Sequence, residues 1–154
     1  MKRVLFGCLG TTDPVRGEHD GPMLHILRHY RPEIALLIIS SEIKELDDKD
    51  NRVEKTRERI VAHWEGYCPT FQCVYVDTWD AHDMDALDQP LHDAMEKFSA
   101  AHPDAEILVN LTSGTPQMQI ILSLPRKFPR GREKFSYFLS DFSVQKDCNC
   151  NRAT

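Results

Sequence analysis

Two polar segments of the chain carry the side chains that could bind a ligand. They are GTTDPVRG, residues 10–17, and NLTSGTP, residues 110–116. Each follows an apolar run and leads toward a helix with a proline in its first turn. The N–H groups and dipole of a helix start favour a phosphate, and glycine lets backbone approach a ligand. Hydroxyls for phosphate or ribose come from Thr11, Thr12, Thr112, Ser113 and Thr115, and Arg16 adds one positive charge.

Established catalytic and metal-binding motifs do not fit the chain. Residues 7–10 are not G-x-G-x-x-G, and neither G-K-[ST] nor H-E-x-x-H occurs. A cysteine-phosphatase loop starting at Cys8 would need arginine where Pro14 stands. His25 and His29 have metal-like spacing, as does CNC at 148–150, but no second ligand group accompanies either. We therefore predict no catalytic residue, no metal and no cofactor.

Strands and helices alternate along the chain, which predicts an α/β fold. The apolar run at 33–40 is typical of a strand buried on both faces of a parallel sheet. We expect a Rossmann-like three-layer sandwich with a mostly parallel sheet. Expected strands are 2–7, 33–40, 70–77, 106–111 and 134–140. Expected helices are 22–31, 42–66 (with a break near 47–50 as an alternative), 84–101 and 116–124.

Three details of this expectation can be compared with the structure. Segment 8–21 is expected to be a polar, glycine-rich loop. Asp20 or Gly21 should cap the helix that begins with Pro22, whereas Pro90 could mark the true start of the helix at 84–101. In a sheet with strand order 3-2-1-4, the loops after the first and fourth strands meet at the switch point, where ligands bind. Plain helix capping is the alternative role of each loop taken alone.

Length and composition suit one globular domain. The chain has 154 residues, 41% of them apolar and 28% charged. Its net charge of −5 argues against a broad surface for long nucleic acids. No apolar run is long enough for a membrane span, and the start does not fit a signal peptide. Five cysteines in no disulfide pattern agree with a reduced, cytoplasmic protein.

The two polar segments also support a resemblance to a known family. GTTDPVRG, then DGPMLHI and RHYRP, then NLTSGTPQM roughly 100 residues after the first, resemble the amino-terminal sensor domain of Csm-type accessory ribonucleases of type III CRISPR systems. That domain is the CRISPR-associated Rossmann fold, or CARF domain. The resemblance covers roughly residues 3–122 and implies a homodimer that holds one cyclic tetra- or hexa-adenylate across its two-fold axis. It implies these ligand-binding residues: Gly10, Thr11, Thr12, Asp13, Arg16, Asn110, Thr112, Ser113, Gly114, Thr115 and Gln117.

The resemblance also sets the expected domain organisation. We expect a CARF sensor domain over residues 1–124 and a divergent C-terminal extension over 125–154, with the family's HEPN ribonuclease domain absent. Arg57 and His63 have the spacing of the HEPN signature but lie in the expected long helix, so we interpret them as a chance match.

Three functions stay open from the sequence. The first is a cyclic oligoadenylate sensor of type III-A antiviral defence without its own effector. The second is a ring nuclease that cleaves the ring without metal, as some family members do through a ribose 2′-hydroxyl. The third is a remnant that binds weakly. Asp13 is the single carboxylate in the first loop, and stabilising the turn before Pro14 is as good a role for it as catalysis.

Overall fold

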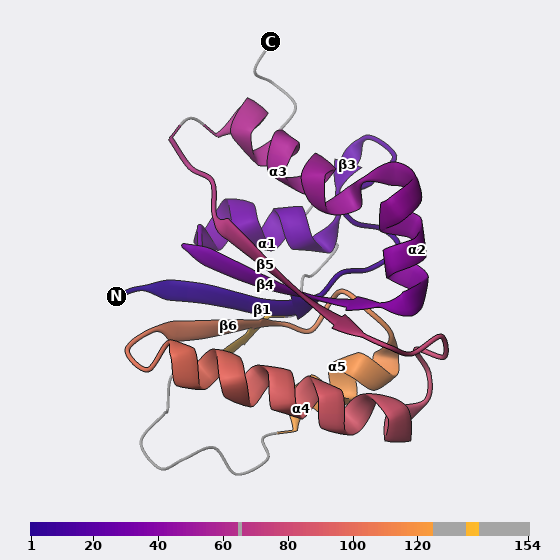
Figure 1. Ribbon diagram of the computed structural model, residues 1–154. Coiled ribbons are helices and arrows are strands. Elements are labelled where there is room, and N and C mark those ends of the chain that lie inside the picture. The colour runs from indigo at the N-terminus through magenta and orange to yellow at the C-terminus, as the bar shows by residue number, and fades with distance from the viewer. Residues whose placement is uncertain (65, 125–134, 139–154) are drawn as a thin grey trace.

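The computed structural model describes residues 1–64, 66–124 and 135–138. A five-stranded sheet has the order β5-β4-β1-β6-β7, and each neighbouring pair is parallel. This arrangement confirms the expected α/β class and the reversal of strand order beside the first strand (Figure 1). The strands are β1 (Arg3–Cys8), β4 (Ile34–Ser40), β5 (Thr70–Val76), β6 (Glu106–Asn110) and β7 (Phe135–Phe138).

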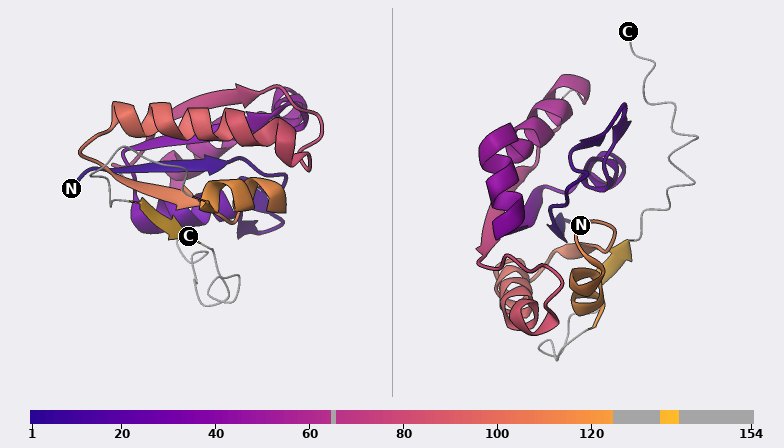
Figure 2. Two further views of the ribbon diagram at one scale, coloured as in Figure 1. Left: turned by 90° about the horizontal axis from the view of Figure 1, so that it is seen from below. Right: turned by 90° about the vertical axis from the view of Figure 1, so that its right-hand side faces the viewer.

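Helices cover both faces of the sheet and form the outer two of three layers. On one face lie α1 (Pro22–Tyr30), α2 (Ser41–Asp50) and α3 (Arg52–His63), and on the other lie α4 (Met84–Ala101) and α5 (Pro116–Ser123) (Figures 1 and 2). Two apolar clusters match these faces. One joins Phe6 and Ile38 to Leu91 and Phe98 of α4, and the other joins Leu37 to the α1 side.

The central strands are apolar because both of their faces are covered. Residues 35–40 of β4 are all buried, as the continuous apolar run predicted. Strand β5, at one edge of the sheet, has exposed and half-buried residues up to its buried end at Val76. Burial of apolar side chains on both faces stabilises this layer arrangement and holds the strand ends in fixed register.

Most helix boundaries agree with the sequence prediction. Gly21 caps α1 and Pro22 occupies its first turn. The expected long helix at 42–66 is two helices, α2 and α3, which meet at Asn51 in the left-handed conformation (φ 53°). The suggestion that Pro90 starts a helix was wrong. Helix α4 begins at Met84 because the Asp83 carboxylate accepts hydrogen bonds from two N–H groups of its first turn.

The expectation of a plain loop at 8–21 was wrong in part. A short hairpin, β2 (Val15–Arg16) and β3 (His19–Asp20), lies within this segment. Its turn contains Gly17 at a φ of 61°. The hairpin carries Arg16 away from the loop at 10–13, which matters for the site described below.

Strand β7 adds the expected fifth strand to the sheet. Its described residues, Phe135–Phe138, pair with β6. Residues 134, 139 and 140 of the expected strand lie outside the described part, as do Cys148 and Cys150. Cys8, Cys68 and Cys73 are free thiols. Across the helices that the structure describes, none combines the length and apolar character needed to cross a membrane.

Candidate functional site

The loops that follow β1 and β6 meet at the switch point of the sheet. β1 pairs with β4 on one side and with β6 on the other, and Gly7 lies opposite Asn110 at the ends of these strands. A methyl group built on Gly10 would lie 3.3 Å from the backbone nitrogen of Gly114. The two loops are therefore in close contact, as the parallel topology predicted.

A pocket of about 250 Å³ lies at this junction. It brings together seven of the residues predicted from sequence: Gly10, Thr11, Thr12, Thr112, Ser113, Gly114 and Thr115. It is also lined by residues that sequence reasoning did not identify: Leu9, Ser40, Glu42, Ile43, Ala81 and Met118.

Asn110 shapes the loop after β6 rather than facing the pocket. It is fully buried, and its Oδ1 accepts hydrogen bonds from the backbone N–H groups of Thr112 (2.8 Å) and Ser113 (3.4 Å). Its Nδ2 donates to the Ser113 hydroxyl at 3.0 Å. This local network is the kind of turn that asparagine forms with the backbone that follows it. Asn110 thus positions Thr112 and Ser113 instead of lining the pocket.

Asp13 plays the corresponding role in the loop after β1. The residue is 2% exposed, and its two carboxylate oxygens accept from the N–H groups of Gly10 and Met23, both at 2.9 Å. Burial raises the pKa of this carboxyl, against the opposing effects of those N–H groups, Ser113 and Arg52. Because both oxygens already have partners within the chain, the geometry supports the turn-stabilising role.

Arg52, at the start of α3, fixes the same loop from outside. Its guanidinium donates to the carbonyl oxygens of Thr11 (2.7 Å) and Asp13 (3.2 Å) and pairs with Asp50. These contacts fix the backbone conformation of residues 10–13. The side chains of Thr11 and Thr12 are exposed and line the pocket.

Gly114 lets the second loop pack against β1. Its φ is 90°, and a methyl group there would lie 2.9 Å from Cβ of Cys8 and 3.1 Å from Sδ of Met118. A side chain would thus meet both backbone strain and a steric clash. Burial raises the pKa of the Cys8 thiol to about 12, so Cys8 is a protonated packing group and not a nucleophile.

Thr115 joins the pocket to a third loop, residues 77–83. It caps α5: its hydroxyl accepts from the N–H of Met118 at 3.3 Å and donates to the carbonyl of Ala81 at 2.5 Å. Gln119 supports the same loop from within α5, since its amide donates to the carbonyls of Thr112 and Gly114. The third loop becomes a wall of the pocket through Ala81.

Two predicted residues lie apart from the pocket in this chain. Arg16 is exposed on the hairpin, and Gln117 bonds to the His82 ring at 3.1 Å instead of lining the cavity. Neither is among the residues that line the cavity.

The pocket wall offers neutral donors and helix dipoles rather than cations. The N-termini of α2 and α5, capped by Ser40 and Thr115, both reach it. Of the described residues that line it, none is lysine or arginine, and Glu42 is the one carboxylate. Hydroxyls and helix starts of this kind suit a phosphate or a ribose.

Grouped metal ligands do not occur in the described part of the chain, where no three His, Cys, Asp or Glu residues lie together. His25 and His29 do contact each other, with ring centroids 4.4 Å apart. Burial lowers the pKa of His25, and the neighbouring His29 lowers it further.

Comparison with known proteins identifies similar chains. A family model described as the Cas_Csm6 CARF domain matches residues 72–133. The CRISPR system endoribonuclease Csm6 of Mycobacterium tuberculosis is 36% identical over 119 residues, which are 77% of this chain and 28% of that protein. The corresponding protein of Enterococcus italicus is 32% identical over 124 residues, 79% of this chain and 28% of its own length.

A solved structure shows the same likeness in three dimensions. Enterococcus italicus Csm6 bound to cyclic hexa-2′-fluoro-hexa-dAMP matches with a TM-score of 0.68 and 29% identity. The match covers 80% of this chain and 30% of that one. The chain therefore spans less than a third of the length of these relatives.

Proposed function

Because this chain belongs to the family of Csm6 CARF domains, we propose that its switch-point pocket binds a cyclic oligoadenylate in type III-A CRISPR antiviral defence. The observation that carries the proposal is the meeting of the loops after β1 and β6 in one pocket with exposed hydroxyls and a helix start. The related Enterococcus italicus protein was solved with a cyclic hexanucleotide analogue.

Each wall of the pocket has a role in this proposal. Thr11 and Thr12 offer exposed hydroxyls to phosphate or ribose from the first loop. From the second loop Thr112 lines the wall, whereas Ser113, whose buried hydroxyl bonds to Asn110, holds the shape of that loop. The start of α5, capped by Thr115, favours negative charge through its dipole. Asp13 and Asn110 act through the loops that they hold.

The size of the pocket supports a shared ligand. A volume of about 250 Å³ is at or below the lower end for small-molecule sites, so it suits one nucleotide unit rather than a ring of four or six. A ring with an even number of identical units can adopt two-fold symmetry, which matches the symmetry of a homodimer. We therefore propose that two copies of this chain hold one ring.

Arg16 and Gln117 have roles outside the pocket in this arrangement. The hairpin begins two residues after Asp13, so an exposed guanidinium at Arg16 lies on the element that directly extends the first loop. In our proposal Arg16 binds phosphates of the ring that extend beyond one pocket. Gln117 holds the third loop through His82.

Ring cleavage is the second candidate function, and Glu42 is the observation that favours it. Its carboxylate lies in the first turn of α2, in the wall of the same pocket. A carboxylate at this place could accept a proton from a ribose 2′-hydroxyl during in-line attack. Asp13 is less suited, because both of its oxygens accept backbone hydrogen bonds.

The test is a thermal melt and calorimetric titration with cyclic tetra- and hexa-adenylate, with linear oligoadenylates of equal length for comparison. A ring at about 100 times its dissociation constant stabilises the protein by ~2.7 kcal/mol, or several degrees for this chain length. Thr11→Val and Thr12→Val remove hydroxyls from the pocket and should weaken binding. Thr70→Val is the matched control. Thr70 is the exposed first residue of β5 and is not among the residues that line the pocket.

The outcomes separate the candidates. Linear product, found by mass analysis with the wild type and lost with Glu42→Gln, would establish a ring nuclease. An unchanged ring with a shifted melt would establish a sensor. If neither ring shifts the melt, or if the pocket variants bind as well as Thr70→Val, the pocket is not the ligand site. Arg16→Ala in the same titration tests the proposed contact outside the pocket.

A further inference from the structure

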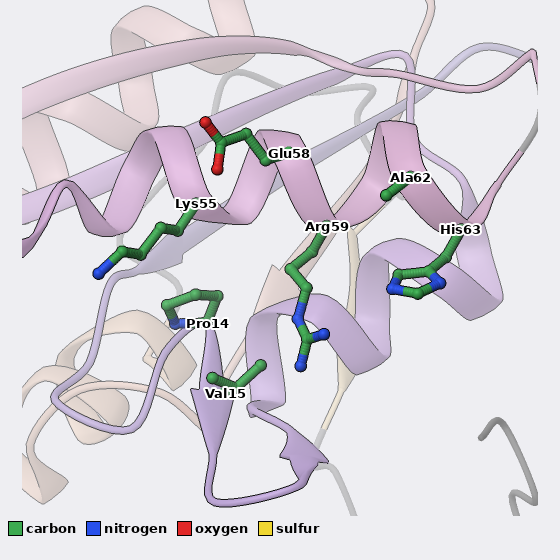
Figure 3. A pocket seen from close by; sticks show the side chains of 7 residues that line it. All are labelled: Pro14, Val15, Lys55, Glu58, Arg59, Ala62 and His63. Carbon is green, nitrogen blue, oxygen red and sulfur yellow. The ribbon is translucent and has the colours of Figure 1, made fainter.

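A second pocket of about 310 Å³ lies between helix α3 and the β2–β3 hairpin (Figure 3). It shares no lining residue with the switch-point pocket. The hairpin supplies one wall and α3 the other. Its lining residues are Pro14, Val15, Lys55, Glu58, Arg59, Ala62 and His63.

Three basic side chains line one face of α3 at this pocket. Lys55, Arg59 and His63 are spaced four residues apart, so they lie on one side of the helix. Figure 3 shows all three on the side of α3 that faces Pro14 and Val15, with Arg59 reaching toward Val15, whereas Glu58 points to the other side of α3. The pocket thus has two cations and an imidazole from one helix in its wall, and Glu58 is the one carboxylate among its described lining residues.

The wall opposite α3 is apolar, so the pocket combines a basic face with an apolar one. Pro14 and Val15, at the start of the hairpin, face Arg59 across the pocket in Figure 3, and Ala62 adds a methyl group on α3 between Arg59 and His63. An apolar surface next to clustered donors suits a ligand with both a flat or apolar part and a charged group.

The cations of this pocket differ from their neighbours on the same helix. Arg52 pairs with Asp50, and Arg57 pairs with Glu54. In residues 1–64, 66–124 and 135–138, by contrast, no ion pair involves Lys55 or Arg59. Like charges four residues apart on a helix repel each other, and an anion between them relieves that repulsion. In a chain of net charge −5, this is a local concentration of positive charge.

We propose that this pocket is a second binding site, which takes a phosphomonoester of about mononucleotide size. Arg59 presents a planar guanidinium that can bind two phosphate oxygens, and Lys55 adds a point charge. His63 can donate a hydrogen bond or stack on a base. The sugar or base packs on Pro14, Val15 and Ala62. The volume is at the lower end of that of small-molecule sites, which limits the ligand to this size.

The test uses three probes on the full chain labelled with nitrogen-15: adenosine monophosphate, inorganic phosphate and adenosine. Adenosine monophosphate should shift the backbone amide signals of Val15, Ala62 and His63. Inorganic phosphate should shift the same signals at higher concentration, and adenosine alone should leave them in place. If phosphate binds as tightly as the nucleotide, the proposal of a nucleotide-sized ligand fails.

Matched charge variants make the test specific. Arg59→Gln and Lys55→Gln should each weaken binding of adenosine monophosphate by about tenfold or more, as expected for the loss of a charge-assisted hydrogen bond. Arg57→Gln removes an equal charge from the same helix but outside the pocket, where Arg57 pairs with Glu54, and should leave affinity within about twofold. Because Lys55 is exposed, its variant remains informative if Arg59→Gln reduces folding.

Three results would overturn the proposal. They are no shift at millimolar nucleotide, shifts confined to the amides of residues 112–115, and an equal effect of Arg57→Gln and Arg59→Gln. The second result would place the nucleotide in the switch-point pocket alone. It would refute the second site while supporting the function proposed above, so the two ideas fail separately.

Discussion

Removing the Thr115 hydroxyl should destabilise the fold and the pocket together. This hydroxyl accepts a hydrogen bond from the Met118 N–H and donates one to the carbonyl of Ala81. The first contact caps α5, and the second connects residues that are 34 positions apart. Thr115→Ala therefore opens the start of α5 and detaches the loop at 77–83 from it.

The magnitude follows from these two contacts. Loss of a threonine cap costs about 1 kcal/mol. Loss of the bond to Ala81 leaves a carbonyl oxygen with one partner fewer and costs about 1 kcal/mol more. The sum is about 2 kcal/mol, which corresponds to a fall in melting temperature of ~4–8 °C for a chain of this length.

Thermal and urea unfolding of Thr115→Ala and Thr115→Ser should measure this cost. Serine keeps the hydroxyl and should restore most of the stability, to within about 0.5 kcal/mol. If serine and alanine destabilise the protein equally, the lost methyl packing and not the hydroxyl explains the effect. Unchanged stability in both variants would refute the reasoning altogether. We also expect Thr115→Ala to weaken ring binding, because the start of α5 and the third loop both form the pocket wall.

Four further substitutions, at Gly114, Gly17, Asp13 and His25, have directions that follow from the structure. Gly114→Ala should lower the free energy of unfolding by about 2–4 kcal/mol, because its methyl group would lie 2.9 Å from Cβ of Cys8 at a φ of 90°. Gly17→Ala is the control: at a φ of 61° with nothing within 4 Å, it should lower that free energy by only ~1 kcal/mol. Urea unfolding measures both. Asp13→Asn replaces an acceptor with an NH₂ group opposite a backbone N–H and should cost about 1–3 kcal/mol. Because burial raises the pKa of Asp13, the stability advantage of the wild type over this variant should be greatest below about pH 4 and should shrink as pH rises through the folded-state pKa. Burial lowers the pKa of His25, so the unfolded chain binds more protons and the free energy of unfolding should fall as pH drops below about 6.5, with a flatter profile in His25→Gln.

The sequence predicted the layers of the fold because its strongest signals are those of buried strands. The run at 33–40 is apolar on both faces, and residues 34–40 form the inner strand β4, which lies between β5 and β1. The hairpin at 15–20 escaped prediction because strands of two residues are too short to show alternation. Pro90 misled for another reason: a capping aspartate, Asp83, fixes the start of α4 six residues before the proline is reached.

The position of the switch-point pocket could be predicted from the sequence, but not all of its lining residues. Parallel topology brings the ends of β1 and β6 together, so two polar loops after those strands point to a pocket. The wall formed by Ser40 and Ala81 comes from tertiary contacts, and no local pattern marks them. The residue types alone could not show that the side chains of Asn110 and Asp13 bond to the backbone of the chain and do not line the pocket. A carboxylate or an amide can bind either a ligand or its own backbone, and the packing of the loop decides which.

The hydrogen bonds of the pocket explain why it can be both rigid and small. Asp13 connects the loop after β1 to the start of α1, and Thr115 connects the loop at 77–83 to α5. Asn110 holds the loop after β6 in a turn by accepting a hydrogen bond from the N–H of Thr112. Each of these side chains is satisfied within the chain, so ligand binding need not reorganise them and pays little ordering cost. The surfaces left for a ligand are then hydroxyls, helix starts, backbone, apolar side chains and the Glu42 carboxylate, with no lysine or arginine among the described lining residues. A polyanionic ring held by one such wall alone would gain little from charge pairing. In our proposal, Arg16 on the neighbouring hairpin and a second copy of the pocket across a two-fold axis supply the remaining affinity.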